Sequence, residues 1–251
     1  MRNPLRFIEN RLVFQPTVAA NGWADAPHRD IEDVYFTSSA GTAIHAWWLP
    51  AAADAPTMLF FSGNGGNLSG RGGTLIRARD QLGVSALIFD YPGYGKSRGR
   101  PTERGCYDTA EGAIRWLGEM KHIAPERVIF YGESLGGGVA TELATRHPCR
   151  ALVLVKTFTS LPGVAKSHFP WLPAHWLMTN RFDSLAKIGR VRCPVFVAGA
   201  TADSVVPYRQ SEQLFAAANE PKQFFRAEGT DHNDRLPDHF WLTLSTFLEL
   251  A

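Results

Sequence analysis

The 251-residue chain is poor in cysteine, with Cys106, Cys149 and Cys193 spread over its length. Three scattered cysteines are too few for a disulfide framework and lack the clustered spacing of a zinc site. The sequence therefore excludes a small disulfide-stapled scaffold. We expect no metal and no organic cofactor.

A long hydrophobic run is also missing. No stretch reaches the roughly 18 consecutive apolar residues that a transmembrane helix needs. The first residues, MRNPLRFIENRLVFQPTV, contain neither the apolar core nor the small-residue cleavage site of a secretory signal. We therefore expect no transmembrane segment and a cytoplasmic location.

An excess of charge of one sign is absent as well, because 26 basic residues face 24 acidic ones and the net charge is +2. This balance supplies no electrostatic argument for a nucleic-acid partner, and we expect none. Hydrophobic residues make up 45% of the chain, an ordinary value for a globular protein with a sizeable core. We expect a single domain over residues 1–251; the oligomeric state is left open.

What the chain does contain is a regular alternation of short apolar runs and amphipathic segments. The apolar runs predict eight strands, at 33–37, 43–49, 57–63, 85–91, 127–132, 151–156, 193–199 and 222–228. Helical patterns lie between or after the later runs, at 106–120, 135–147, 208–219 and 236–250. This alternation predicts an α/β fold with an eight-stranded, mostly parallel sheet flanked by helices. Short connections between the first strands predict an antiparallel pair there.

One segment, at about 157–190, interrupts this rhythm. Pro162, Pro170 and Pro173 exclude one long helix. The segment is rich in apolar residues, which predicts a short cap that places an acyl or aromatic group in the pocket. A helical excursion that merely covers a sheet edge remains the alternative.

The sequence GESLG at 132–136 matches the G-x-S-x-G pattern, which is weak alone and strong in context. It follows a predicted strand and opens a predicted helix, the setting of a nucleophile elbow. A side chain at Gly132 or Gly136 would collide with the neighbouring strand or helix. We therefore predict Ser134 as a nucleophile that needs a base and a carboxylate.

The base and the carboxylate should follow in the order serine, acid, histidine. Asp203 lies in the loop after the strand at 193–199, and His232 lies in the loop after the last strand. Both therefore lie at the carboxyl edge of the sheet, where Ser134 must also be.

Other candidates for these two roles fit less well. Asp183 comes too early, and Asp231 is adjacent to His232, from where it would struggle to reach the imidazole Nδ1. The remaining histidines precede the sheet core, lie at helix ends or in the insertion, or belong to the last helix: His28, His45, His122, His147, His168, His175 and His239.

Two further glycine loops fail the nucleotide-binding patterns. The GKS at 95–97 lacks the first P-loop glycine, because that position is Asp90. The loop SGNGGNLSG lacks the third dinucleotide glycine, because that position is Leu68. The remaining role of SGNGGN is an oxyanion hole, which we predict from the backbone amides of Asn64 and Leu135.

These motifs together resemble the α/β-hydrolase superfamily, and more closely the serine hydrolases that include Bem46 and the ABHD12-, ABHD13- and ABHD17-type proteins. The resemblance spans roughly residues 57–235 and rests on FFSGNGGN, DYPGYGKSRGRPTE, GESLGGGVA, TFTSLPGVAKSHFPWLP, RFDSLAKIGRVRCPVFVAGATADSVVP and DHND. It implies the same roles for Ser134, Asp203, His232, Asn64 and Leu135.

The chain departs from this family at two places near the predicted site. Ser62 stands where the family usually has histidine, and GATAD stands where HGxxD is more common. The triad is intact, so these departures bear on substrate preference.

We therefore expect a serine hydrolase that cleaves a small-molecule carboxylic ester, thioester or other acyl substrate. An amidase or aminopeptidase on the same triad is the alternative within enzymes. A non-catalytic binding protein of the same fold is the alternative outside them.

Overall fold

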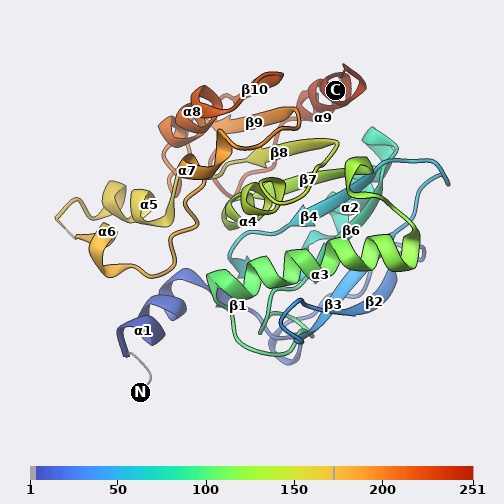
Figure 1. Cartoon of the computed structure of the whole chain (residues 1–251), viewed down its shortest axis with the longest axis horizontal. Helices are drawn as coiled ribbons and strands as arrows, with labels where there is room; N and C mark the ends of the chain where they lie inside the picture. Colours follow the sequence, from blue (N-terminus) through green and yellow to red (C-terminus); the bar gives the residue numbers. More distant parts are fainter. Residues whose placement is uncertain (1–3, 172, 251) are drawn as a thin grey trace.

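A central sheet of eight strands organises the chain, and the computed structural model describes residues 4–171 and 173–250 (Figure 1). The strands lie in the order β10-β9-β8-β7-β4-β6-β3-β2. Their bounds are β2 Glu32–Thr37, β3 Ala43–Leu49, β4 Thr57–Phe61, β6 Ser85–Phe89, β7 Val128–Glu133, β8 Ala151–Val155, β9 Val195–Ala200 and β10 Lys222–Ala227. Each of the eight predicted strands is present, with ends that differ by at most two residues.

Strand directions follow the predicted pattern. β2 pairs antiparallel with β3, and β3 pairs antiparallel with β6. The other neighbouring strands of this sheet are parallel. The predicted α/β fold with a mostly parallel sheet is therefore confirmed.

Helices cover both faces of the sheet. The described helices are α1 Pro4–Val13, α2 Gly72–Leu82, α3 Glu103–Lys121, α4 Leu135–Ala144, α5 Leu161–His168, α6 Ala174–Leu177, α7 Leu185–Ile188, α8 Tyr208–Ala217 and α9 His239–Leu250. One core layer holds α3, α4 and α8 against the sheet, and the other holds α2 and α9. All strand residues of β4, β6 and β8 are buried, as expected for strands covered on both sides.

Outside the segment 157–190, two of the described helices were not predicted from the sequence. α2 begins with Gly72 and Gly73 and buries only a narrow stripe, including Leu75 and Ala78. The glycine-rich start and the polar residues Arg77, Arg79, Asp80 and Gln81 hide its period. α1 is amphipathic as well, but it lies outside the sheet layers (Figure 1).

The parallel strands end at the side of the sheet where α1, α5 and α6 lie (Figure 1). The segment 157–190 contains α5, α6 and α7, none of which is longer than eight residues. A small second sheet pairs β1 (Gln15–Pro16) with β5 (Gly65–Gly66) and so joins the amino-terminal segment to the glycine loop after β4. Among the described helices, none has the length and hydropathy required to cross a bilayer.

Candidate active site

Ser134 lies on a sharp turn between β7 and α4. Its backbone has φ 53° and ψ −119°, a conformation that costs a non-glycine residue on the order of 1–3 kcal/mol. The surrounding glycines let the strand and helix approach closely enough to hold it. A Cβ on Gly136 would lie 1.9 Å from the carbonyl oxygen of Phe61, and one on Gly132 would lie 2.6 Å from the carbonyl oxygen of Gly136. The local geometry is that of a nucleophile elbow.

Three residues from separate segments meet at this turn. His232 Nε2 lies 3.0 Å from Ser134 Oγ, and His232 Nδ1 lies 2.8 Å from Asp203 Oδ2. The side chains of Asp203 and His232 are 1% and 10% exposed. Because a carboxylate only accepts hydrogen bonds, the proton of the neutral imidazole belongs on Nδ1. Nε2 is then free to accept the hydroxyl proton of Ser134.

The Asp203 carboxylate is itself oriented by the loop that follows β9. Its Oδ1 accepts hydrogen bonds from the amides of Val205 and Val206, at 2.9 and 2.7 Å. Its Oδ2 is directed to His232. Both oxygens therefore have defined partners, and the imidazole is held in one orientation.

Asp231, the rival carboxylate, has a different role in the structure. Its Oδ1 accepts from the amides of Ser204 and His232, both at 2.7 Å. The hydrogen bond from the Ser204 amide, followed by the one from the His232 amide, holds the pKa of Asp231 below its usual value. Asp231 thus links the loops that carry Asp203 and His232. The imidazole nitrogens of His232 contact Asp203 and Ser134 instead.

A cavity of about 440 Å³ opens at Ser134 and His232. Its lining consists of Gln15, Gly63, Asn64, Gly65, Arg71, Glu133, Ser134, Val205, His232 and Asn233. None of the described residues of 157–190 lines this cavity, so the acyl or aromatic group that the apolar cap led us to expect in the pocket stays a prediction. Phe169, Trp171 and Trp176 of the insertion are more than half exposed, whereas Phe158 and Phe182 are buried in the core.

Asn64 and Leu135, predicted to supply the oxyanion amides, both lie near Ser134. Asn64 lines the same cavity as Ser134. Leu135 is the first residue of α4, so its amide precedes the hydrogen-bond ladder of the helix.

The glycine loop that contains Asn64 is held from outside by the amino-terminal segment. Asn64 Nδ2 donates to the carbonyl of Val13 at 3.0 Å, and its own carbonyl accepts from the amide of Gln15 at 3.0 Å. The hydroxyl of Tyr94 donates to the same carbonyl at 2.7 Å. Sequence reasoning missed this support, since nothing in residues 13–17 marks them as partners of a loop 50 residues away.

Ser62, where the chain departs from its family, lies directly after β4. Its carbonyl accepts a hydrogen bond from the Tyr91 hydroxyl at 3.2 Å. Within the described part of the chain, its buried Oγ has no hydrogen-bond partner. The side chain is therefore a small, unpaired polar group beside the loop of Asn64.

Lys156, at the end of β8, is a second residue that the sequence analysis did not single out. It is 2% exposed and has a left-handed backbone with φ 48°. Its Nζ donates to the carbonyls of His232 at 2.8 Å, Asp234 at 2.5 Å and Asp231 at 3.4 Å. Burial lowers the pKa of Lys156, while the negative charges of Glu133 and Asp203 oppose that shift. A lysine that ends the apolar run ALVLV was the available signal.

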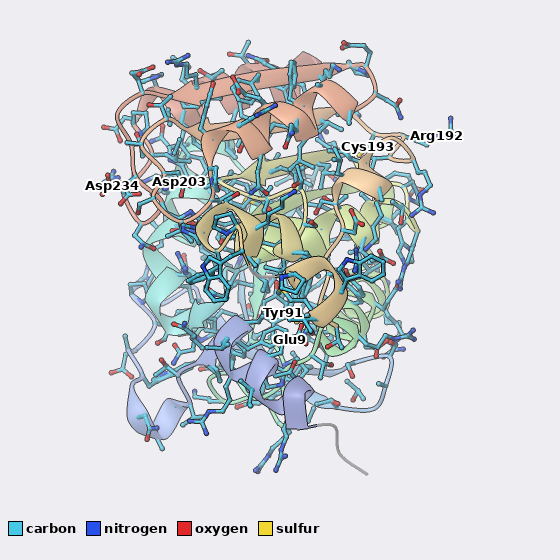
Figure 2. All side chains as sticks on the ribbon, turned by 90° about the vertical axis from the view of Figure 1, so that its left-hand side faces the viewer. Glu9, Tyr91, Arg192, Cys193, Asp203 and Asp234 are labelled. Atoms are coloured by element: carbon cyan, nitrogen blue, oxygen red, sulfur yellow. The ribbon has the colours of Figure 1, made fainter. Side chains whose placement is uncertain are left out.

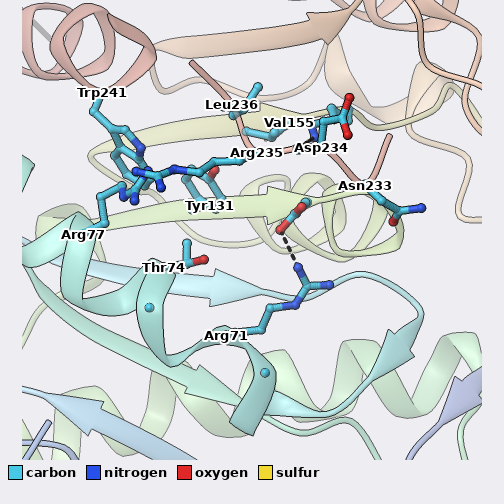
Figure 3. Close-up of a pocket in the computed structure, with 14 residues that line it drawn as sticks. Arg71, Thr74, Arg77, Tyr131, Val155, Asn233, Asp234, Arg235, Leu236 and Trp241 are labelled. Atoms are coloured by element: carbon cyan, nitrogen blue, oxygen red, sulfur yellow. Dashed lines mark hydrogen bonds and ion pairs between the residues drawn. The ribbon is translucent and has the colours of Figure 1, made fainter. Parts of the chain in front are cut away.

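A second cavity, of about 330 Å³, adjoins the first and shares Arg71, Glu133 and Asn233 with it (Figure 3). Arg71 Nη1 lies 3.4 Å from Glu133 Oε2, the carboxylate of the residue before Ser134. Arg77 and Arg235 point along the cavity toward Trp241 (Figure 3). Charged side chains therefore flank Ser134 on this side.

Comparisons with known proteins agree with the geometry. The family model described as the alpha/beta hydrolase fold matches residues 56–177. The chain is 38% identical to the uncharacterized protein Rv2307c of Mycobacterium tuberculosis, with 90% of this chain and 81% of that protein covered. It is 31% identical to the lysophosphatidylserine lipase ABHD12 of Danio rerio, with 82% of this chain and 55% of that protein covered.

Solved structures show the same architecture. The Pyrococcus furiosus esterase Pf2001 superposes with a TM-score of 0.75 over 94% of this chain and 99% of that one, at 18% identity. An acetyl xylan esterase from Paenibacillus sp. R4 superposes with a TM-score of 0.68, over 90% of this chain and 86% of that one, at 20% identity. At these identities the likeness concerns the fold. The match to the family model and the similarity in sequence to these relatives show that the chain belongs to the α/β hydrolase family.

Proposed function

We propose that the protein is a serine hydrolase that cleaves carboxylic esters or thioesters through an acyl-enzyme. The observation that carries the proposal is the continuous chain of contacts from Asp203 through His232 to Ser134. A serine hydroxyl is a weak nucleophile until a base takes its proton, and an imidazole is an effective base when its other nitrogen is held. The names of two relatives in sequence and structure, a lipase and an esterase, agree with an ester substrate.

In the acylation step, His232 Nε2 takes the hydroxyl proton as Ser134 Oγ forms a bond to the carbonyl carbon. The negative charge collects on the former carbonyl oxygen. The tetrahedral intermediate collapses as the bond to the leaving group breaks, and the imidazolium returns its proton to that group. Asp203 stabilises the imidazolium and keeps its orientation throughout.

In the deacylation step, water repeats the sequence. His232 takes a proton from water, the hydroxide adds to the acyl carbon, and the bond to Ser134 Oγ breaks. The carboxylic acid leaves, and Ser134 regains its proton from His232. No cofactor enters either step.

We assign the oxyanion to the backbone amides of Asn64 and Leu135. Asn64 lines the cavity beside Ser134, and Leu135 opens the helix whose positive end is directed at the serine. Loss of one such donor typically lowers turnover by about 10²–10³. The anchoring of the Asn64 carbonyl by Gln15 and Tyr94 keeps the loop in place before substrate binds.

A series of p-nitrophenyl esters of increasing chain length, with a matched thioester and a matched anilide, tests the proposal. We expect hydrolysis of the esters or the thioester, and a loss of about 10⁵-fold or more in Ser134→Ala at an unchanged melting temperature. Faster cleavage of the anilide than of the ester would make the protein an amidase. A folded wild-type protein that cleaves none of these compounds would be a binding protein.

A further inference from the structure

Exposed apolar side chains gather on α1 and on the segment between α5 and α7. Six large apolar residues there are each more than half exposed, and we call them the aromatic rim: Ile8, Leu12, Phe169, Trp171, Trp176 and Leu177. Trp176 reaches 87% exposure. Elsewhere in the described chain, comparably exposed apolar residues are scattered over separate elements, such as Tyr35 on β2, Met120 on α3 and Leu242 on α9. Single exposed residues are ordinary, whereas a cluster indicates an interaction surface.

The two parts of the rim form one surface. The Glu9 carboxylate of α1 accepts hydrogen bonds from the amides of Thr179 and Asn180, at 2.6–3.0 Å. It also accepts from the hydroxyl of Thr179 and the side-chain amide of Asn180. α1 and α6 accordingly lie next to each other in both views (Figures 1 and 2).

The rim shares a face of the molecule with the candidate active site. Figure 2 looks onto the side of the sheet where the parallel strands end, with α1 and the insertion in front and Asp203 labelled at the same face. The rim and Asp203, the hydrogen-bond partner of His232, therefore lie on the same side of the sheet.

Basic side chains accompany the rim, although the chain as a whole is nearly balanced in charge. Residues 143–182 contain no aspartate or glutamate, and they include Lys166 and Arg181. α1 contributes Arg11, and its one carboxylate is the Glu9 that the 179–180 backbone engages. Lys166 and Arg11 are exposed. The acidic loop residue Asp234 lies at the margin of this face, away from the insertion (Figure 2).

Protruding tryptophans with flanking cations are the signature of interfacial membrane binding. Indole rings settle at the level of lipid headgroups, and lysine and arginine are attracted to anionic headgroups. A protein partner would more commonly meet aromatic anchors set in a packed patch with a polar rim. The rim instead presents its rings on short helices and turns, and the only ring contact between rim residues in the described chain is the edge contact of Phe169 with Trp171.

We propose that the aromatic rim docks this protein peripherally on an anionic lipid surface, with the opening above Ser134 turned toward that surface. Docking on a lipid surface does not depend on which bond the protein cleaves. It can therefore be tested separately from the proposed hydrolysis.

Co-sedimentation with lipid vesicles, without any substrate, tests the docking. We expect the wild-type chain to bind phosphatidylcholine vesicles that contain phosphatidylglycerol, to bind pure phosphatidylcholine more weakly, and to be partly released by salt. The emission of the exposed tryptophans should shift to shorter wavelength on binding.

Paired variants separate the rim from the rest of the surface. Trp171→Ser and Trp176→Ser should each weaken binding roughly tenfold, because a large apolar side chain no longer leaves water. Leu242→Ser, which removes an equally exposed apolar residue from α9, should bind as the wild type does. Lys166→Glu should weaken binding to the anionic vesicles, whereas Arg192→Glu, at the opposite end of the sheet, should not.

Several results would overturn the proposal. These are no binding to either vesicle, equal loss of binding in Leu242→Ser, and binding that is independent of both tryptophans in a double variant. A concentration-dependent dimer that the double variant abolishes would assign the rim to a second copy of the chain instead. Melting temperatures close to that of the wild type would show that the variants are folded. Binding by the Ser134→Ala variant would show that docking is independent of hydrolysis.

Discussion

Two regions share the carboxyl edge of the sheet and are built by opposite means. The loops of Ser134 and Asp203 follow strands that are buried on both sides, and the loop of His232 follows the edge strand β10. The polar groups of these loops have partners inside the protein. α1 and the α5–α6 segment stand outside the sheet layers and expose large aromatic residues. In the first region, close packing and hydrogen bonds hold the side chains of Asp203 and His232 in one position. The second is held together by the hydrogen bonds of Glu9, but its large apolar side chains are exposed to solvent.

We expect the largest effect from a substitution of Asp203, the proposed acid of the first region. Asp203→Asn should lower kcat by about 10⁴-fold, because an amide no longer enforces the tautomer with the proton on Nδ1. Asp231→Asn is the matched control, since Asp231 touches the backbone amide of His232 and not its ring. Steady-state hydrolysis of a p-nitrophenyl ester measures both. If Asp231→Asn costs as much as Asp203→Asn, the assignment of the acid is wrong.

The next effect concerns the packing that creates the elbow. Gly136→Ala places a Cβ 1.9 Å from the carbonyl of Phe61, so we expect a loss of about 3 kcal/mol or more in the free energy of unfolding. Gly118→Ala, in α3, meets no atom within 4 Å and should stabilise the protein by about 0.5–1 kcal/mol. Urea unfolding compares the two. If Gly136→Ala leaves the free energy of unfolding unchanged, the close packing at this turn does not contribute to stability.

Lys156 offers a way to loosen the first region without touching its reacting atoms. Lys156→Met removes the hydrogen bonds to the carbonyls of His232 and Asp234. We expect kcat to fall about 10–100-fold with little change in KM, since small misplacement of a base affects the transition state more than binding.

The pH profile of kcat/KM distinguishes a positioning role of Lys156 from a purely structural one. Removing its charge near the imidazole should also move the pH profile of kcat/KM toward higher pH, because the imidazolium would lose a nearby like charge. A Lys156→Met variant that is less stable, but keeps the wild-type kcat and pH profile, would exclude a positioning role.

The smallest expected effect is on the second region, at the Glu9 contact. Partial burial opposes ionisation, but the hydrogen bonds from Thr179 and Asn180 outweigh it and hold the pKa of Glu9 below its usual 4.5. A lowered carboxyl pKa contributes stability that is present above pH 4.5 and is lost as the pH falls through the lowered value. At neutral pH, Glu9→Gln should therefore raise amide hydrogen exchange at Thr179 and Asn180 about five- to tenfold.

The exchange of the α4 amides provides the internal control for that variant, because α4 is in the core and should be unaffected. In the wild-type protein, acidification below pH 4.5 should raise the amide exchange rates of Thr179 and Asn180, after correction for intrinsic rates. In the Glu9→Gln variant, the same acidification should leave these corrected rates unchanged. Equal acid sensitivity in both proteins would place the titrating group elsewhere.

How much could be predicted from the sequence differs between the same two regions. Buried strands leave continuous apolar runs, and the elbow requires small residues on both sides of Ser134, so both are visible in the chain itself. The order of Asp203 and His232 after successive strands brings them to one edge because parallel strands end there. These constraints are local in sequence or follow from topology.

What could not be predicted depends on contacts between distant surface segments. Nothing local marks Lys156 as a donor to carbonyls 76 residues later, or Gln15 as a support for the Asn64 loop. The apolar composition of the insertion is compatible with a short cap and with a cover for a sheet edge, because composition does not show which side chains are buried. Only the fold shows that Phe169 and Trp171 point to solvent.

The most direct test of the central claim is labelling with a fluorophosphonate probe, followed by intact mass measurement and peptide mapping. We expect a single adduct per chain, located on Ser134, absent in Ser134→Ala and formed much more slowly in His232→Gln and Asp203→Asn. A folded wild-type protein that forms no adduct at Ser134, or that labels equally fast without His232, would contradict the central claim.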